Sequence, residues 1–368
     1  MTLSKNLFLI GWLAFMYVLS TQFNVYRKER VCGFTQYRFI WSFAILVFLP
    51  IIWQAAYRGD FVDTYNYNRS FRELPTTLSG LLSYLPSVSK DQGFTLLSGL
   101  IKLLIGNRSV TYLAVIAAIQ GLAIISVFRK YSTNMIISVF LFVASTDYVS
   151  WMFNGIRQFM AVTLIFAATG LMLRQKWVPT ILVILLASTM HQSALLMIPV
   201  VFVVQGKAWN GWTLLCLLGA MFAVMFVDQF TDILDNMMQD TQYSNVVSDW
   251  EEWNDDGTSF FRVAVYAVPT VLSLIGLRYI RTEGDFLINI CANMSILSTS
   301  LYIISMFTSG VFMGRLPIYM SLYNYILLPW EIEHMFTRRS QKIVMLCMLG
   351  AYVAFDFFQV RIVWGWPL

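Results

Sequence analysis

Apolar runs of about 20 residues recur along the chain from residue 6 to residue 363, and short polar segments separate them. A helix needs about 20 mostly apolar residues to cross a bilayer. Charged residues make up only 12% of the 368 residues, whereas soluble domains carry about 25%. No segment reads as a separate soluble domain. The pattern predicts an all-α, polytopic integral membrane protein that forms a single membrane domain, residues 1–368.

Positively charged loops give this prediction an orientation, because basic residues in short loops favour the cytoplasm. The strongest anchor follows the first span (about 6–23) and contains Arg27, Lys28, Arg30 and Arg38. The other spans are expected at about 39–57, 109–128, 133–152, 157–173, 178–204 (a hairpin that turns near His191), 211–228, 261–279, 285–307, 315–333 and 342–360.

One apolar stretch, 94–106, is short and contains Lys102. If it crossed the membrane, Arg129 and Lys130 would lie outside, so we expect an interfacial or re-entrant helix instead. With this assumption the chain makes about 12 crossings, and all five basic clusters lie on the cytoplasmic side.

Two polar segments, 58–93 and 228–260, then become outer loops. The second holds nine acidic residues, from Asp228 to Asp256, and no Lys or Arg. Such a loop is translocated freely, because acidic residues have little influence on orientation.

Metal and redox chemistry have weak support in the sequence. The four cysteines form no CxxC pair, and the chain has only two histidines. The cysteines are expected to pack as small apolar residues, and without a His/Cys cluster we expect neither a metal site nor a cofactor.

Ionisable residues at membrane depth cost a few kcal/mol each and therefore tend to mark function. Arg157 follows Asn154 at the start of an apolar helix, and Gln158 is next to it. Arg157 is either an arginine that extends to the membrane interface or part of an anion site formed with the free N–H groups of the helix start.

His191 interrupts an apolar stretch on the outer side. It is either a packed core residue or a general base, because imidazole titrates near neutral pH.

Arg315 precedes Tyr319 and Tyr323, which are expected on one helix face. These three form either an aromatic belt at the interface or a pocket for sugar and phosphate, which the fork of an arginine binds well.

The stretch RGDFVDTYNY combines charges and aromatic rings just after the second span. It places Arg58, Asp60, Asp63 and Tyr67 on the outer side. A carboxylate there could activate a hydroxyl while arginines hold an anionic leaving group. A solvated loop of mixed charge is the alternative.

Four pieces in order make a more specific pattern: Asp63, Thr64, Tyr67 and Phe71 as DTxxYxxxF, then NGIRQFMAVTLIFAA, MHQSALLMIP and GRLPIYMSLYNYILLP. This series, from about residue 40 to 330, resembles the EpsG family of bacterial polysaccharide polymerases, which is related to the Wzy O-antigen polymerases. The chain departs from the family pattern in its long acidic loop and in the glycine-poor run before Asp63, which weakens the role of Asp60.

The resemblance implies a glycosyltransferase of the bacterial inner (cytoplasmic) membrane, similar to the GT-C enzymes, with its active site facing the periplasm. Its substrates would be undecaprenyl-pyrophosphate-linked oligosaccharide repeats of an O-antigen, capsule or exopolysaccharide. Asp63 or His191 would act as catalytic base, and the anomeric carbon would be inverted as undecaprenyl pyrophosphate leaves. Arg157, Arg315 and Arg58 would bind the pyrophosphate.

Further substrate contacts are expected from Asp60, Tyr67, Gln158, Tyr319 and Tyr323. Membrane lipids and, from the family likeness, a chain-length regulator are the expected partners; nucleic acid is not.

Two alternative functions use related substrates. A flippase or transporter of lipid-linked oligosaccharide should show internal repeats, which the sequence lacks. An O-antigen ligase would share the chemistry, but the order of the motifs disfavours it.

Overall fold

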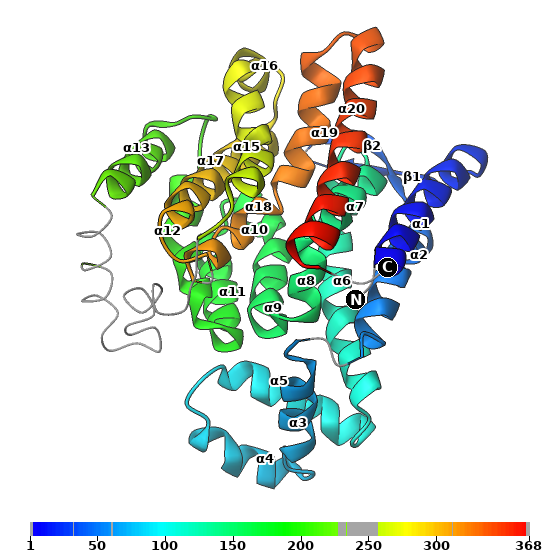
Figure 1. Ribbon diagram of the computed structural model, residues 1–368, viewed down its shortest axis with the longest axis vertical. Helices are drawn as coiled ribbons and strands as arrows, with labels where there is room; N and C mark the ends of the chain where they lie inside the picture. Colours follow the sequence, from blue (N-terminus) through cyan, green and yellow to red (C-terminus); the bar gives the residue numbers. More distant parts are fainter. Residues whose placement is uncertain are drawn as a thin grey trace. The chain divides into compact units, whose positions relative to one another are not determined.

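The computed structural model describes residues 3–31, 33–59, 62–226, 233, 257–310 and 312–365. Asp60 and most of the acidic segment 228–260 therefore lie outside the described residues. Within the described part the chain is helical apart from a two-stranded hairpin (Figure 1). It forms two compact units, Met1–Ile198 with Ser340–Leu368, and Pro199–Arg339. Each is described by itself below.

The first unit consists of α1 (Leu3–Gln22), α2 (Trp41–Ala56), α3 (Thr64–Glu73), α4 (Leu78–Tyr84), η1 (Leu85–Ser87), α5 (Gln92–Ile105), α6 (Ser109–Tyr131), α7 (Met135–Ala144), α8 (Asp147–Phe153), α9 (Ile156–Ala167), α10 (Thr169–Leu173), α11 (Trp177–Met190), η2 (Gln192–Leu196) and most of α20 (Arg338–Phe357), which continues as η5 (Phe358–Val363).

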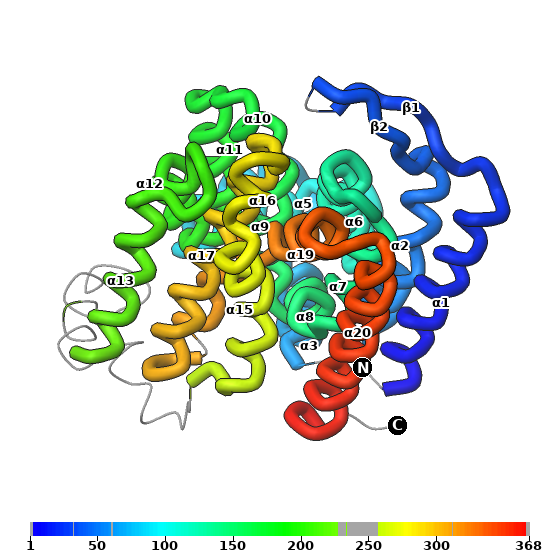
Figure 2. The backbone as a smooth tube through the Cα atoms, turned by 90° about the horizontal axis from the view of Figure 1, so that it is seen from above, coloured from blue at the N-terminus to red at the C-terminus, as the bar shows by residue number. Residues whose placement is uncertain are grey.

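The basic segment after α1 is a β-hairpin, which the sequence had suggested only as a loop. Strands β1 (Tyr26–Val31) and β2 (Phe34–Phe39) pair antiparallel and follow α1 in the chain trace (Figure 2). Arg129, in the last turn of α6, ties the hairpin to the helices: its Nε donates to the Phe39 carbonyl at 2.6 Å. Its guanidinium also pairs with the Glu29 carboxylate. Much of the positive charge expected at this end is therefore fixed on a folded element.

The short apolar stretch is α5, a helix of 14 residues. Lys102 explains why it carries a cation. The buried ammonium donates hydrogen bonds to the carbonyl oxygens of Arg72, at 2.7 Å, and Leu74. These belong to the end of α3, where free carbonyls and the helix dipole favour a cation. Lys102 thus holds α5 to the polar helix α3, and α4 joins the same group (Figure 1).

The predicted span 133–152 is broken, which corrects the expectation of one continuous helix. α7 and α8 meet at an angle of 75°. Thr146 lies between them in the left-handed region, with φ 63°, a conformation that a β-branched residue rarely adopts. The bend brings the end of α8 to the start of α9.

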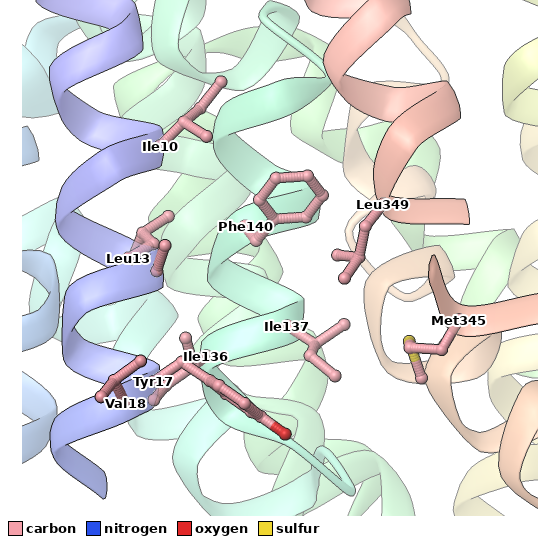
Figure 3. A pocket seen from close by; sticks show the side chains of 10 residues that line it. Ile10, Leu13, Tyr17, Val18, Ile136, Ile137, Phe140, Met345 and Leu349 are labelled. Carbon is pink, nitrogen blue, oxygen red and sulfur yellow. The ribbon is translucent and has the colours of Figure 1, made fainter. Parts of the chain in front are cut away.

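An apolar cavity of about 360 Å³ lies among α1, α7 and α20 in the first unit. Figure 3 shows Ile10, Leu13, Phe140 and Leu349 around it. Its lining offers no charged side chain to an anion, so this cavity is not where the predicted arginines would act.

The second unit contains most of α12 (Met197–Val203), and α13 (Gly211–Met225), α15 (Phe260–Ile275), α16 (Leu277–Thr282), α17 (Phe286–Met306), η4 (Met313–Arg315), α18 (Ile318–Ser321) and α19 (Asn324–Met335).

α17 is the central helix of this unit, because nearly all of its residues are buried and it packs against α13, α15 and α19. Buried amides on α17 hold the segment before α13: the Oδ1 atoms of Asn289 and Asn293 accept the N–H groups of Ala208 and Trp209. The predicted span 315–333 is divided among η4, α18 and α19, so the expectation of one continuous helix there was wrong.

The helices confirm a protein of the membrane class. Five described helices are long and apolar enough to cross a bilayer, and the bent pair α7–α8 makes a sixth if it counts as one span. Six shorter apolar helices of 10–17 residues accompany them. We therefore treat the chain as embedded in a membrane.

Candidate active site at the start of helix α9

The motif NGIRQ forms the junction between α8 and α9. Gly155 is required there, because a Cβ at this position would lie 2.2 Å from the Trp151 ring. α9 begins at Ile156, so Arg157 and Gln158 lie in its first turn, as the sequence predicted. The first N–H groups of a helix have no partner within it and carry partial positive charge. The junction therefore gathers positive potential at one end of α9.

Arg58 comes to this junction from the end of α2. Its side chain is only 7% exposed. Nε donates to Thr64 Oγ1 at 2.9 Å, and Nη1 donates to the Met152 carbonyl at 3.3 Å. Nη2 is buried without a hydrogen-bond partner in the described structure. A buried cation with an unused donor is costly and is well suited to bind an anion.

Asn154 joins α3 to the same junction. Its side-chain Oδ1 accepts the backbone N–H of Asp63 at 2.9 Å, and its carbonyl accepts the Tyr67 hydroxyl at 2.7 Å. Asp63 directly precedes α3, and Tyr67 lies one turn later. The backbone of Asp63, a partly buried residue, is thereby tied to the residue just before the start of α9.

Arg157 forms an ion pair that the sequence did not indicate. Its Nη1 lies 2.8 Å from Asp91 Oδ2. The Asp91 side chain is only 6% exposed, whereas that of Arg157 is 45% exposed. Arg157 therefore pairs with a buried carboxylate, while its own side chain stays partly accessible.

The surroundings shift three pKa values at this junction. Burial lowers the pKa of Arg58 to about 10, and the neighbouring Tyr67 and Tyr112 oppose that change. Burial raises the pKa of Tyr67, while Arg157 lowers it and Asp63 raises it. Burial also raises the pKa of Asp91 against the opposing charges of Arg157 and Lys90. These mutual effects show that Arg58, Asp63 and Arg157 all act electrostatically on the Tyr67 hydroxyl.

His191 and Gln158 meet through a serine. His191 follows α11, and its Nδ1 lies 2.7 Å from Ser193 Oγ. Gln158 Nε2 donates to the same Oγ at 3.2 Å. Since Gln158 is adjacent to Arg157, the histidine is connected by hydrogen bonds to the first turn of α9.

A comparison with models of protein families identifies the family of this chain. The model described as EpsG family matches residues 41–364. This chain belongs to the EpsG family. The family is associated with polysaccharide polymerase-like proteins. Comparisons with curated proteins and with solved structures give no significant match.

In this EpsG-family chain the predicted site residues fall into two groups. Arg58, Asp63, Tyr67, Arg157, Gln158 and His191 belong to the first unit and are linked by the contacts described above.

The other predicted residues are separate from these. Arg315 is exposed in η4 of the second unit. Tyr319 and Tyr323 are 1% and 0% exposed. Because α18 ends at Ser321 and α19 begins at Asn324, these tyrosines do not share one α-helix, and that expectation is corrected. Their roles stay predictions, and Asp60 is outside the described residues.

Sequence reasoning missed Asp91 and Ser193 and gave Asn154 no specific role. Asn154 was noticeable as a polar residue before a helix start, and Ser193 lies within the HQSA motif. Asp91, in the polar run SVSKDQG, gave no local signal, because its partner Arg157 is 66 positions away.

The chemical capacity of the junction is that of an anion site with a carboxylate and an imidazole nearby. Among the described residues, no group of three or more His, Cys, Asp or Glu side chains could hold a metal ion. The charge available for an anionic ligand is that of Arg58 and Arg157, together with the N–H groups at the start of α9.

Proposed function

We propose that this EpsG-family protein polymerises undecaprenyl-pyrophosphate-linked oligosaccharide repeats by inverting glycosyl transfer. The observation that carries the proposal is that Arg58, Arg157 and Asp63 meet at one helix start in a chain of this family. Such a transfer needs a base for the acceptor hydroxyl and positive charge for a departing pyrophosphate, and this junction offers both.

In the proposed reaction the acceptor sugar hydroxyl loses its proton to Asp63 or His191. Its oxygen forms the new bond to the anomeric carbon of the growing chain, and the bond to undecaprenyl pyrophosphate breaks with inversion. Negative charge grows on the leaving pyrophosphate. Arg157 and Arg58 stabilise that charge most strongly at the transition state, where preorganised donors act.

We further propose that the protein lies in the bacterial inner membrane with this junction on the periplasmic side. The twelve-crossing arrangement, similar to that of GT-C enzymes, is part of this proposal, with α5 as the partial helix. Arg315, Tyr319 and Tyr323 keep their proposed roles in pyrophosphate and sugar binding, which variants of each residue test separately. A chain-length regulator remains the proposed partner.

The test is complementation of a strain that lacks this protein, with surface polysaccharide resolved on a gel. Arg157→Ala and Arg58→Ala should reduce long chains to single repeats at unchanged protein level, because loss of one charge-stabilising donor costs about 10²–10³ in turnover. Arg69→Ala is the matched control, since Arg69 pairs with Glu73 on the exposed face of α3. Such exposed pairs contribute little.

The base is assigned by the same gel. Asp63→Asn and His191→Gln are compared, and the variant that loses the whole ladder identifies the base. Two results would replace the proposal. Disappearance of single repeats from the surface would indicate a transporter, and a normal ladder that is not attached to its final lipid would indicate a ligase.

A further inference from the structure

The ion pair between Arg157 and Asp91 has a feature that the proposed reaction does not use. The two partners differ in exposure: the Asp91 side chain is 6% exposed and that of Arg157 is 45% exposed. A ligand can therefore reach the guanidinium but not the carboxylate. Asp91 is for this reason a poor base for an acceptor sugar.

Asp91 is also held firmly. Its backbone adopts φ 54° in the left-handed region, and its carbonyl accepts the Thr95 N–H at 3.0 Å in the first turn of α5. Two residues on, α5 touches α11 so closely that a Cβ on Gly93 would lie 2.0 Å from Thr189 Oγ1. Asp91 is thus anchored at the start of α5, which is packed closely on α11, and the positive end of α5 favours the charge of its carboxylate.

The charge of Arg157 acts on two oxygen groups: the Asp91 carboxylate, with which it pairs, and the Tyr67 hydroxyl, whose pKa it lowers. A carboxylate at 2.8 Å from Nη1 fixes the plane of the guanidinium, since the fork has a rigid geometry. It also offsets part of the charge that an incoming anion meets. Asp91 therefore has two opposite effects on an anionic ligand. By orienting Arg157 it stabilises the transition state, and by compensating the charge of Arg157 it weakens the binding of substrate and product.

We propose that Asp91 is the positioning residue of Arg157 and the internal counter-ion with which a lipid diphosphate competes. Asp91 aims the arginine at the leaving diphosphate and, by competing for it, lets the product depart. This inference rests on the proposed function and adds a regulation of the same site. Catalysis profits only from interactions that are stronger in the transition state than in the bound states.

The test measures binding and turnover separately. Purified protein in nanodiscs is titrated with farnesyl diphosphate as a short-chain probe, with farnesyl monophosphate for comparison. Asp91→Asn keeps the size of the side chain and removes its charge. We expect the Kd for farnesyl diphosphate to fall about 3- to 10-fold, while polymerisation falls about 10-fold or more because Arg157 loses its orientation.

Controls separate this role from a structural one. Glu73→Gln removes a carboxylate of an exposed ion pair 2.9 Å from Arg69 and should change neither quantity. Asp91→Glu retains the charge and should restore part of the turnover. In an Arg157→Ala background, Asp91→Asn should no longer tighten binding, because coupled residues are non-additive. A destabilised protein could not bind the probe more tightly than the wild type.

The inference is overturned if Asp91→Asn leaves the Kd unchanged or raises it, or if the tightening persists without Arg157. Failure of the proposed function has a different signature. In that case wild-type protein would not convert lipid-linked repeats into a ladder, whatever the binding of the diphosphate probe in the Asp91 variants.

Discussion

At the scale of single residues, the arginines of the first unit differ in what their surroundings already satisfy. Arg129 is paired with Glu29 and donates to the Phe39 carbonyl, so it serves the hairpin. Arg58 is equally buried, but its Nη2 atom has no partner within the described part of the chain. Buried polar groups are normally paired. Arg58 therefore keeps a donor that a ligand could use at the start of α9, whereas the contacts of Arg129 hold the hairpin.

Tyr67 is the residue through which the parts of the junction meet, and its hydroxyl can be tested alone. Tyr67→Phe removes the 2.7 Å hydrogen bond to the Asn154 carbonyl, which contributes about 1 kcal/mol. We expect polymerisation to fall about 5-fold, because Asp63 and Arg157 are then less firmly placed. The yield of long chains at equal protein level measures this.

The control is Tyr65→Phe, on the same helix. Tyr65 is 62% exposed and should tolerate the loss of its hydroxyl with wild-type activity. If both variants behave alike, the Tyr67 hydroxyl has no part in placing the site.

Site residues were predictable from the sequence where charge and apolar context conflict. Arg157 lies at the start of an apolar run and His191 interrupts another, so the sequence alone marks them as candidates. Asp91 was not predictable, because a carboxylate in a polar loop is ordinary and only the tertiary structure brings it to Arg157. The same applies to Ser193, whose link between His191 and Gln158 depends on how α9 and α11 pack.

At the scale of elements, hydrophobic runs located the helices well but not their breaks. Most predicted spans correspond to helices in the structure. The short apolar stretch 94–106 lies in α5, and α11 ends at Met190, just before the predicted turn at His191. The bend at Thr146 was missed, because Ser and Thr are compatible with a helix and the surrounding run is apolar. The hairpin was missed for a related reason: its strands are short and β1 is rich in charge, a composition that also suits a loop.

The contact between α5 and α11 can be tested with a single methyl group. Gly93→Ala would place Cβ 2.7 Å from Thr189 Cβ and 3.0 Å from its backbone carbon, so α5 must move away. Overpacking of this kind costs about 1–3 kcal/mol. We expect a lower melting temperature in detergent and reduced polymerisation, because Asp91 moves with α5.

Gly11→Ala in α1 is the matched control, since its Cβ would meet nothing within 4 Å. Alanine is favoured over glycine in a helix by about 1 kcal/mol, so this variant should melt at the same temperature or higher. Equal melting and activity for the two variants would show that α5 has room to adjust without disturbing the site.

At the scale of the whole molecule, the sidedness of the membrane decides whether the proposed chemistry is possible. Lipid-linked repeats are proposed to be joined on the periplasmic side, so α3 and the start of α9 must face that side. The hairpin, with Arg27, Lys28 and Arg30, is expected on the cytoplasmic side. Both elements belong to the first unit, and a single pair of labelling sites therefore tests the orientation.

The measurement uses a chain whose four cysteines are replaced and whose ability to complement is retained. One new cysteine is placed at Arg69 of α3 and another, in a separate variant, at Arg30 of β1; both positions are exposed. An impermeant maleimide added to spheroplasts should label Arg69→Cys at once, and Arg30→Cys only after the membrane is opened. The reverse result would place Arg58, Asp63 and Arg157 on the cytoplasmic side. A periplasmic polymerase would then be impossible, however well these residues are arranged for diphosphate departure.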